Sequence, residues 1–248
     1  MLYKSLKSNS ELVDFETALK NGLAKDGGLY FPTSITALDE SFIKSLPQKS
    51  NHEIAFEVIK QFVGNNINEI DLKEIIKKTL NFPFPLVEIE KNILTLELFH
   101  GPTLAFKDVG AKFMANCLGY FNKDNDTTVL VATSGDTGAA VANGFLGVKG
   151  IKVIILYPSG KVSEIQEHQL TTNGKNIIAL KVNGVFDDCQ KIVKTAFTDK
   201  ELNSKINLTS ANSINVARWL PQMFYYFIAY KELIKQKKDI IFSIPSGN

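Results

Sequence analysis

The segment from Leu96 to Asp108 reads LELFHGPTLAFKD. It overlaps a short apolar run, 93–99, that predicts a buried strand, and its Gly-Pro pair predicts a tight turn. After the turn, apolar residues recur with helical spacing, so we expect a helix over 108–121. This order of strand, turn and helix places Lys107 where a helix begins, at the carboxyl end of a strand.

Lys107 is therefore a candidate for covalent chemistry. The N-terminus of a helix carries partial positive charge, which disfavours a second positive charge there. A lysine that is also shielded from water loses its proton more readily, and the neutral amine is the form that makes a Schiff base. The neighbours Leu104, Ala105 and Phe106 are apolar or small, which favours a buried setting. The alternative is a solvated lysine, the commonest state of this residue type.

Composition excludes several classes of protein. The 248 residues suit one large domain or two small ones, and 44% hydrophobic with 22% charged residues is ordinary for a soluble globular protein. A net charge of +2 gives no reason to expect nucleic acid or a membrane as partner. The longest aromatic run, 223–230, is too short to span a bilayer, and residues 1–16 lack the apolar segment of a secretory signal. We therefore expect a cytoplasmic protein.

The cysteines and histidines agree with this expectation. Cys117 and Cys189 lie in helical patterns, so we expect packed thiols rather than a disulfide. Reduced thiols fit a reducing cytosol. The three histidines show no paired metal-ligand spacing, and we expect no metal.

The pattern of the chain changes near residue 90. Residues 1–90 are expected to be mostly helical, with helices at 10–19, 53–63 and 70–80. Beyond them, strands are expected at 93–99, 128–132, 152–157, 176–182 and 239–244. Helices are expected at 108–121, 137–147, 162–172, 186–198 and 216–235. This alternation predicts an α/β domain with a largely parallel sheet, helices on both faces, and ligands at the carboxyl ends of the strands.

A polar loop, TSGDTG at residues 133–138, directly follows the strand expected at 128–132. Its two glycines let the backbone curl, so that amides and hydroxyls face one point at the start of the next helix. Such an arrangement binds anions. The alternative is that these residues only cap the helix. The spacing differs from that of a nucleotide-binding P-loop.

A second polar segment, SANSINVARW at residues 210–219, precedes the helix expected at 216–235. Arg218 falls on the first turn of that helix, where the helix dipole opposes a cation. An anion held between the polar side chains and Arg218 would remove this conflict. The alternative is a simple Asn or Ser cap followed by a solvated arginine.

Together these segments resemble the threonine synthase family, whose members are fold-type-II enzymes dependent on pyridoxal phosphate (PLP). HGPTLAFKD resembles the family's segment around the cofactor lysine, and the final SGN resembles the beginning of its loop for the cofactor phosphate. The resemblance extends over the whole chain. It implies PLP as the cofactor, Lys107 as the catalytic residue that binds it covalently, and contacts from Asp136, Gly247 and Asn248. Many relatives have Asn in place of Asp136, so its contact with the cofactor ring depends on a shared proton.

The resemblance also implies a substrate and its contacts. The family converts O-phosphohomoserine and water to threonine and phosphate, the last step of threonine biosynthesis. The loop before helix 137–147 is implied to bind the substrate carboxylate, and the segment before helix 216–235 its phosphate. The implied substrate-binding residues are Thr133, Ser134, Gly135, Thr137, Asn212, Ser213 and Arg218.

Members of the family continue well beyond the point that corresponds to residue 248. We therefore expect a helical region at 1–90 and a PLP-binding region at 91–248, with a smaller movable subdomain at about 125–205. The chain by itself is expected to be inactive, to bind PLP weakly or not at all, and to be either aggregation-prone or held together by self-association. Two alternatives stay open: another fold-type-II lyase, of the serine or threonine dehydratase kind, and a non-catalytic binding module.

Overall fold

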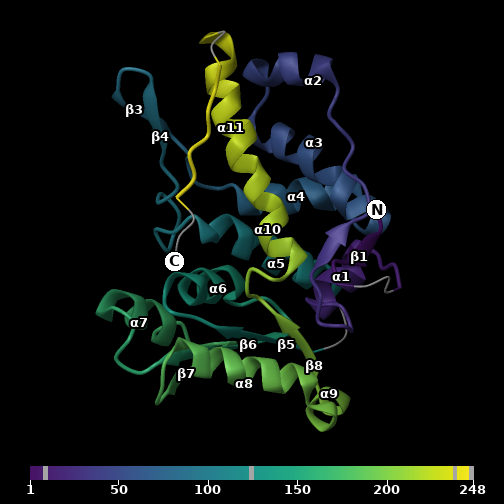
Figure 1. Ribbon diagram of the computed structural model, residues 1–248, viewed down its shortest axis with the longest axis vertical. Coiled ribbons are helices and arrows are strands. Elements are labelled where there is room, and N and C mark those ends of the chain that lie inside the picture. The colour runs from purple at the N-terminus through teal and green to yellow at the C-terminus, as the bar shows by residue number, and fades with distance from the viewer. Residues whose placement is uncertain (8–10, 123–125, 237–238, 246–248) are drawn as a thin grey trace.

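The structure, a computed structural model, describes residues 1–7, 11–122, 126–236 and 239–245 (Figure 1). The lower half of the view contains a four-stranded parallel sheet in the order β7-β6-β5-β8. Its strands are β5 (Thr127–Ala132), β6 (Ile151–Pro158), β7 (Ile177–Val182) and β8 (Asn207–Ser210). The first three confirm predicted strands, whereas β8 lies where the sequence indicated no strand.

Helices cover both faces of this sheet, with α5 and α6 on one side and α8 on the other (Figure 1). The helices of this half are α5 (Lys107–Phe121), α6 (Asp136–Phe145), α7 (Glu164–Thr171), α8 (Phe186–Thr198) and α9 (Lys200–Lys205). Because side chains alternate along a strand, β5 sends Val129 and Val131 into the larger core and Leu130 and Ala132 into the smaller core under α8. The central strands β5 and β6 are largely buried on both sides, whereas the edge strand β7 is partly exposed, and this arrangement confirms the predicted α/β class.

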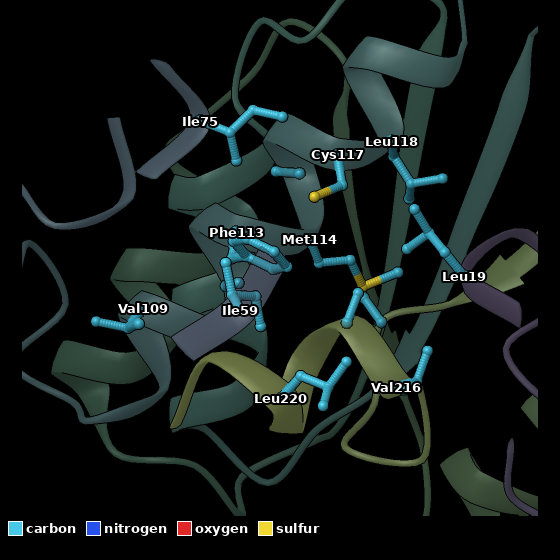
Figure 2. Close-up of a cluster of buried hydrophobic side chains, with 14 of the residues drawn as sticks. Leu19, Ile59, Ile75, Val109, Phe113, Met114, Cys117, Leu118, Val216 and Leu220 are labelled. Atoms are coloured by element: carbon cyan, nitrogen blue, oxygen red, sulfur yellow. The ribbon is translucent and has the colours of Figure 1, made fainter. Parts of the chain in front are cut away.

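The other half of the molecule packs around α5. Its helices are α1 (Phe15–Asn21), α2 (Glu40–Ser45), α3 (Asn51–Val63), α4 (Glu69–Thr79), α10 (Val216–Trp219) and α11 (Met223–Leu233). Short 3-10 helices occupy Leu46–Gln48, Gly64–Asn66, Leu220–Gln222 and Ile234–Gln236, and β1 (Tyr3–Ser5) pairs antiparallel with β2 (Tyr30–Pro32). Figure 2 shows Phe113 and Met114 of α5 among apolar side chains that include Ile59, Leu19 and Val216. Since α5 packs into both halves, it fixes Lys107 relative to the sheet.

Both cysteines are buried free thiols, Cys117 in the core around α5 and Cys189 on α8, as the helical patterns predicted. Within the described ranges, no group of three or more His, Cys, Asp or Glu side chains is placed to hold a metal ion. No helix among the described residues is long and apolar enough to cross a membrane.

The strand predicted at 93–99 is shorter than expected and lies outside the parallel sheet. β4 (Ile93–Leu96) pairs antiparallel with β3 (Leu86–Glu90) in a separate, largely exposed hairpin. Asn92, with φ of 65°, allows the tight turn between them. Residues 97–106 separate β4 from Lys107, so the prediction that the strand before Lys107 belongs to the parallel sheet is wrong. Pairing with the adjacent segment removed this apolar run from the sheet.

Two predictions near the end of the chain also need correction. The helix expected at 216–235 is interrupted by a 3-10 turn at Leu220–Gln222, because Pro221 has no amide hydrogen for a helical hydrogen bond. Residues 239–245 form no strand and instead run back beside α11, where the ring of Phe242 contacts Tyr226 (Figure 1). An apolar run becomes a strand only where a neighbouring strand pairs with its backbone.

Candidate active site

Lys107 and Asp136 begin two helices that meet at the carboxyl end of β5. Lys107 is the first residue of α5, and Asp136 is the first residue of α6, just after β5 ends at Ala132. Lys107 Nζ lies 3.3 Å from Asp136 Oδ2, with 27% of the lysine side chain and 51% of the aspartate side chain exposed. An ion pair this open to water contributes little to stability. The amine can therefore exchange the carboxylate for a ligand at low cost.

The apolar residues before Lys107 do not bury it. Leu104 is 68% exposed and Phe106 is 42% exposed, whereas Ala105 is nearly buried. The ring of Phe106 lies beside the amine, with 5.1 Å between Nζ and the ring centroid. The prediction of a lysine shielded by these neighbours is therefore wrong. Lys107 is partly open to solvent, which gives a covalent ligand access to it.

The loop 133–138 turns one hydroxyl inward and two outward. Thr133 is buried, and its Oγ1 accepts hydrogen bonds from the amides of Gly135 at 3.0 Å and Gly138 at 2.8 Å. Ser134 is exposed and Thr137 is half-buried. Gly135, with φ of 144°, takes a backbone conformation that strains other residues and precedes α6 without a capping side chain. The hydroxyls of Ser134 and Thr137 and the first amides of α6 can thus bind an anion at the start of this helix.

Gln166 is a site residue that the sequence did not reveal. It lies on α7, and its Nε2 donates to Asp136 Oδ1 at 2.8 Å. Its Oε1 accepts from the amide and the hydroxyl of Ser163, at 3.2 and 3.1 Å, so the orientation of the Gln166 amide is determined. The pattern Ser163-x-x-Gln166 indicates a helix start, but it carries no information about a partner on another helix.

The segment before α10 uses most of its polar side chains within the protein. Asn212 donates from Nδ2 to the carbonyl oxygen of Ala132 at 2.8 Å and accepts from the amide of Ala132 at 3.3 Å. Asn215 caps α10 by accepting from the amide of Ala217 at 3.0 Å. Ser213 is exposed. Of these side chains, Ser213 is the one presented to solvent.

Arg218 lies on α10, as predicted, but it is not solvated. It is 1% exposed, and its Nη1 donates to the carbonyl oxygen of Ala211. Burial lowers the pKa of Arg218 to about 10, against the opposing influence of Tyr225 and Asp108, so the guanidinium stays charged at neutral pH. Its Nε has no hydrogen-bond partner among the described residues. The role of Arg218 as a phosphate ligand stays a prediction, as do the roles of the other implied site residues.

Two of the implied cofactor residues, Gly247 and Asn248, lie outside the described residues. The remaining ones, Lys107 and Asp136, lie together at the carboxyl end of the sheet, next to the loop 133–138. Fold and site together give an α/β domain in which a partly exposed lysine amine lies beside a helix start, and a helix start of this kind can accept an anion.

Comparison with known proteins identifies the family. The chain belongs to the family of pyridoxal-phosphate dependent enzymes, whose pattern matches residues 79–247. Residues 2–80 match a second family, described as the threonine synthase N terminus.

Similar proteins and structures carry the name threonine synthase. The chain is 46% identical to the threonine synthase of Buchnera aphidicola subsp. Acyrthosiphon pisum, over 98% of this chain and 58% of that protein. The crystal structure of threonine synthase from Escherichia coli superposes with a TM-score of 0.88 at 43% identity, covering 94% of this chain and 54% of that one. A PLP-bound threonine synthase from Brucella melitensis gives 0.87 at 39% identity, covering 94% and 52%. The chain thus spans a little over half the length of the relatives it matches and corresponds to their N-terminal part.

Proposed function

We propose that this chain is the N-terminal, lysine-bearing part of a threonine synthase that converts O-phosphohomoserine and water to threonine and phosphate. The observation that carries the proposal is the position of Lys107. Its amine lies 3.3 Å from Asp136 and is 27% exposed, beside the loop 133–138 at the carboxyl end of a parallel sheet. The names of the relatives support a threonine synthase, and this geometry supports Lys107 as the residue that binds the cofactor.

The residues present fit PLP at its reactive end. Lys107 offers a primary amine that an aldehyde can reach, and Asp136 offers a carboxylate at hydrogen-bond distance from that amine. When bound, PLP acts as an electron sink for the charge that develops on the substrate. The carboxylate of Asp136 could lie beside an oxygen of the cofactor only with a proton shared between the two oxygens.

Lys107 has two tasks in this proposal. It attaches the cofactor, and its released amine then moves protons among the α, β and γ carbons of the substrate. Phosphate leaves from the γ carbon, and water adds at the β carbon. A lysine at the edge of the sheet that is only partly buried can perform both tasks.

We place the substrate carboxylate at the start of α6, between Ser134, Gly135 and Thr137. The buried hydroxyl of Thr133 stabilises this loop by accepting hydrogen bonds from two of its amides. Charge-assisted hydrogen bonds from helix amides and hydroxyls suit a carboxylate. We place the substrate phosphate near Asn212, Ser213 and Arg218. The exposed hydroxyl of Ser213 and the unpartnered Nε of Arg218 support this second site.

We also propose that the chain divides into residues 1–90 and 91–248, and that residues of about 125–205 form a movable subdomain. The separate small core between the sheet and α8 supports a subdomain with its own packing. A cytoplasmic location, self-association and the absence of turnover by the 248-residue chain alone remain predictions.

The test is covalent trapping of the cofactor. The protein is mixed with excess PLP, reduced with borohydride, digested and analysed by mass spectrometry; because reduction makes the bond to the lysine permanent, weak binding is recorded as well. We expect the mass increase at Lys107, its loss in Lys107→Ala, and its retention in Lys112→Ala. Lys112 is a fitting control because it lies on the same helix with its amine on Asn81, at 2.7 Å. Labelling spread over many lysines, with Lys107 unfavoured, would refute the proposal.

A further inference from the structure

The turn that precedes Lys107 is held from a distant part of the chain. Tyr225 of α11 donates its hydroxyl hydrogen to the carbonyl oxygen of Phe106, the residue immediately before Lys107. Phe106 is the N-cap of α5, and no side chain makes the usual cap hydrogen bond there. Tyr225 therefore fixes a helix start that lacks its own local cap.

The residue after Lys107 is held as well. Asp108 is 1% exposed, and its carboxylate accepts from the amide of Thr103 at 3.0 Å and from the hydroxyl of Thr103 at 2.5 Å. These bonds close the turn from Thr103 to Asp108. Gly101 lies so close to Asp108 that a Cβ at this position would collide with the carboxylate, which explains the glycine of the Gly-Pro pair.

The charges around Tyr225 keep its hydroxyl a donor. Burial raises the pKa of Tyr225, Asp108 raises it further, and the opposing effect of Arg218 is smaller. The phenol thus remains protonated wherever the protein is folded. Its ring also packs against Phe84, with 5.6 Å between ring centroids, so the hydroxyl can be removed without emptying the space.

We propose that Tyr225 is a positioning residue for Lys107, and that it acts with the Thr103–Asp108 bonds to hold the lysine's backbone in place. The backbone of both neighbours of Lys107 in the chain is held by hydrogen bonds, whereas the lysine side chain contacts the exposed carboxylate of Asp136 and the ring of Phe106. A long side chain reaches a fixed point reproducibly only if its own backbone is fixed. The inference rests on the proposed function of Lys107 and adds the residues that position this lysine.

The first test compares two tyrosines of the same helix. In Tyr225→Phe, we expect PLP trapped by borohydride at Lys107, relative to the label at the exposed Lys194 of α8, to fall by about threefold to tenfold, the equivalent of one hydrogen bond. Tyr226→Phe removes a hydroxyl from the neighbouring residue, which is 41% exposed and contacts Phe242, and should leave the ratio unchanged. Lys194 serves as the internal standard because α8 packs on a separate core, so differences in the amount of protein and in the extent of reduction cancel.

Thr103 gives a second pair of variants. Thr103→Val removes the hydroxyl that bonds to Asp108 and should lower the ratio, and Thr103→Ser, which keeps the hydroxyl, should restore it. Equal ratios in the unmodified protein, Tyr225→Phe and Thr103→Val would overturn the proposal.

Amide hydrogen exchange separates this proposal from the cofactor assignment. In Tyr225→Phe, exchange should become faster in a peptide covering residues 103–112 and stay unchanged in one covering α8, whose core is separate. If Lys107 takes no label even in the unmodified protein, the proposed function fails and exchange alone decides. Faster exchange confined to residues 103–112 would then support the positioning role, and unchanged exchange would overturn it.

Discussion

The loop before α6 and the segment before α10 have similar compositions, but they differ in how many of their polar side chains are bonded within the protein. Each places hydroxyl, amide or carboxylate side chains ahead of a helix at the carboxyl edge of the sheet. In the first, Thr133 alone turns inward, and Ser134 stays exposed. In the second, Asn212 and Arg218 are both bonded to backbone carbonyl groups, and only Ser213 of the three implied phosphate ligands is exposed.

The cause of this difference lies in the neighbouring strands. β8 pairs with β5 only as far as Ser210 opposite Leu130, so Ala132 extends beyond the paired part of β8. Asn212 supplies the missing partners for the amide and carbonyl of Ala132. A polar residue ahead of a helix is open to a ligand only where the nearby backbone already has partners. Composition alone does not separate these two situations.

Arg218→Ala should give the largest effect on this comparison. Removal of a guanidinium that is 1% exposed leaves a cavity and an unpaired carbonyl at Ala211, so we expect the free energy of unfolding to fall by about 3 kcal/mol or more. Urea unfolding followed by circular dichroism measures the change. Arg218→Met, which keeps much of the side-chain volume, should lose less.

The opposite result would favour the phosphate role of Arg218. In that result, Arg218→Ala leaves stability unchanged and weakens binding of O-phosphohomoserine by about 1.5–3 kcal/mol. Both segments then bind the substrate, and the structural role that we assign to the segment before α10 is wrong. Calorimetric titration of the folded variant with the substrate distinguishes the two cases.

Asn212→Ala and Ser213→Ala form a matched pair with a smaller effect. Loss of Asn212 leaves both the amide and the carbonyl of Ala132 without their partner, and we expect about 1–3 kcal/mol of destabilisation. Ser213 is exposed, so its substitution should change stability by less than about 0.5 kcal/mol. Denaturant midpoints of the two variants provide the measurement. Equal midpoints would show that Asn212 does not serve the end of β5.

Glu167→Gln should give the smallest effect, confined to one side of the pH range. Glu167 lies on α7 next to Gln166, whose side chain contacts the loop before α6. Hydrogen bonds from Lys181 and then Tyr157 keep the pKa of Glu167 below its usual value. A carboxyl with a lowered folded-state pKa stabilises the protein above its unfolded pKa, and this contribution is lost as the pH falls through the folded value. The stability difference between the two proteins should therefore be present at neutral pH and disappear well below about pH 4.

Thermal melts at several pH values measure this difference. Glu201→Gln is the control, because its exposed pair with Lys205 on α9 lies outside the site. A difference between wild type and Glu167→Gln that stays constant down to acid pH would contradict the role of the ionised carboxylate.

Local patterns identified most of the sheet and its helices. The helix predicted at 186–198 coincides with α8, and the strand predicted at 128–132 matches β5, because apolar spacing over several turns or alternations is itself a local property. The runs 93–99 and 239–244 do not join the parallel sheet: the first forms the short hairpin strand β4, and the second forms no strand. Each is apolar enough for a sheet strand, but whether it joins the sheet depends on a partner that spacing does not reveal.

The sequence by itself determined most of the alternating strands and helices, the helix start at Lys107 and the polar loop 133–138, since turns, caps and periodicity act within a few residues. Only the tertiary structure decided what those residues meet. Gln166 reaches Asp136, Tyr225 reaches Phe106, and the Arg218 guanidinium lies buried instead of exposed. These contacts join residues 30 and 119 positions apart in the first two cases. Packing of α5, α7 and α11 sets such distances, and no local rule of sequence contains them.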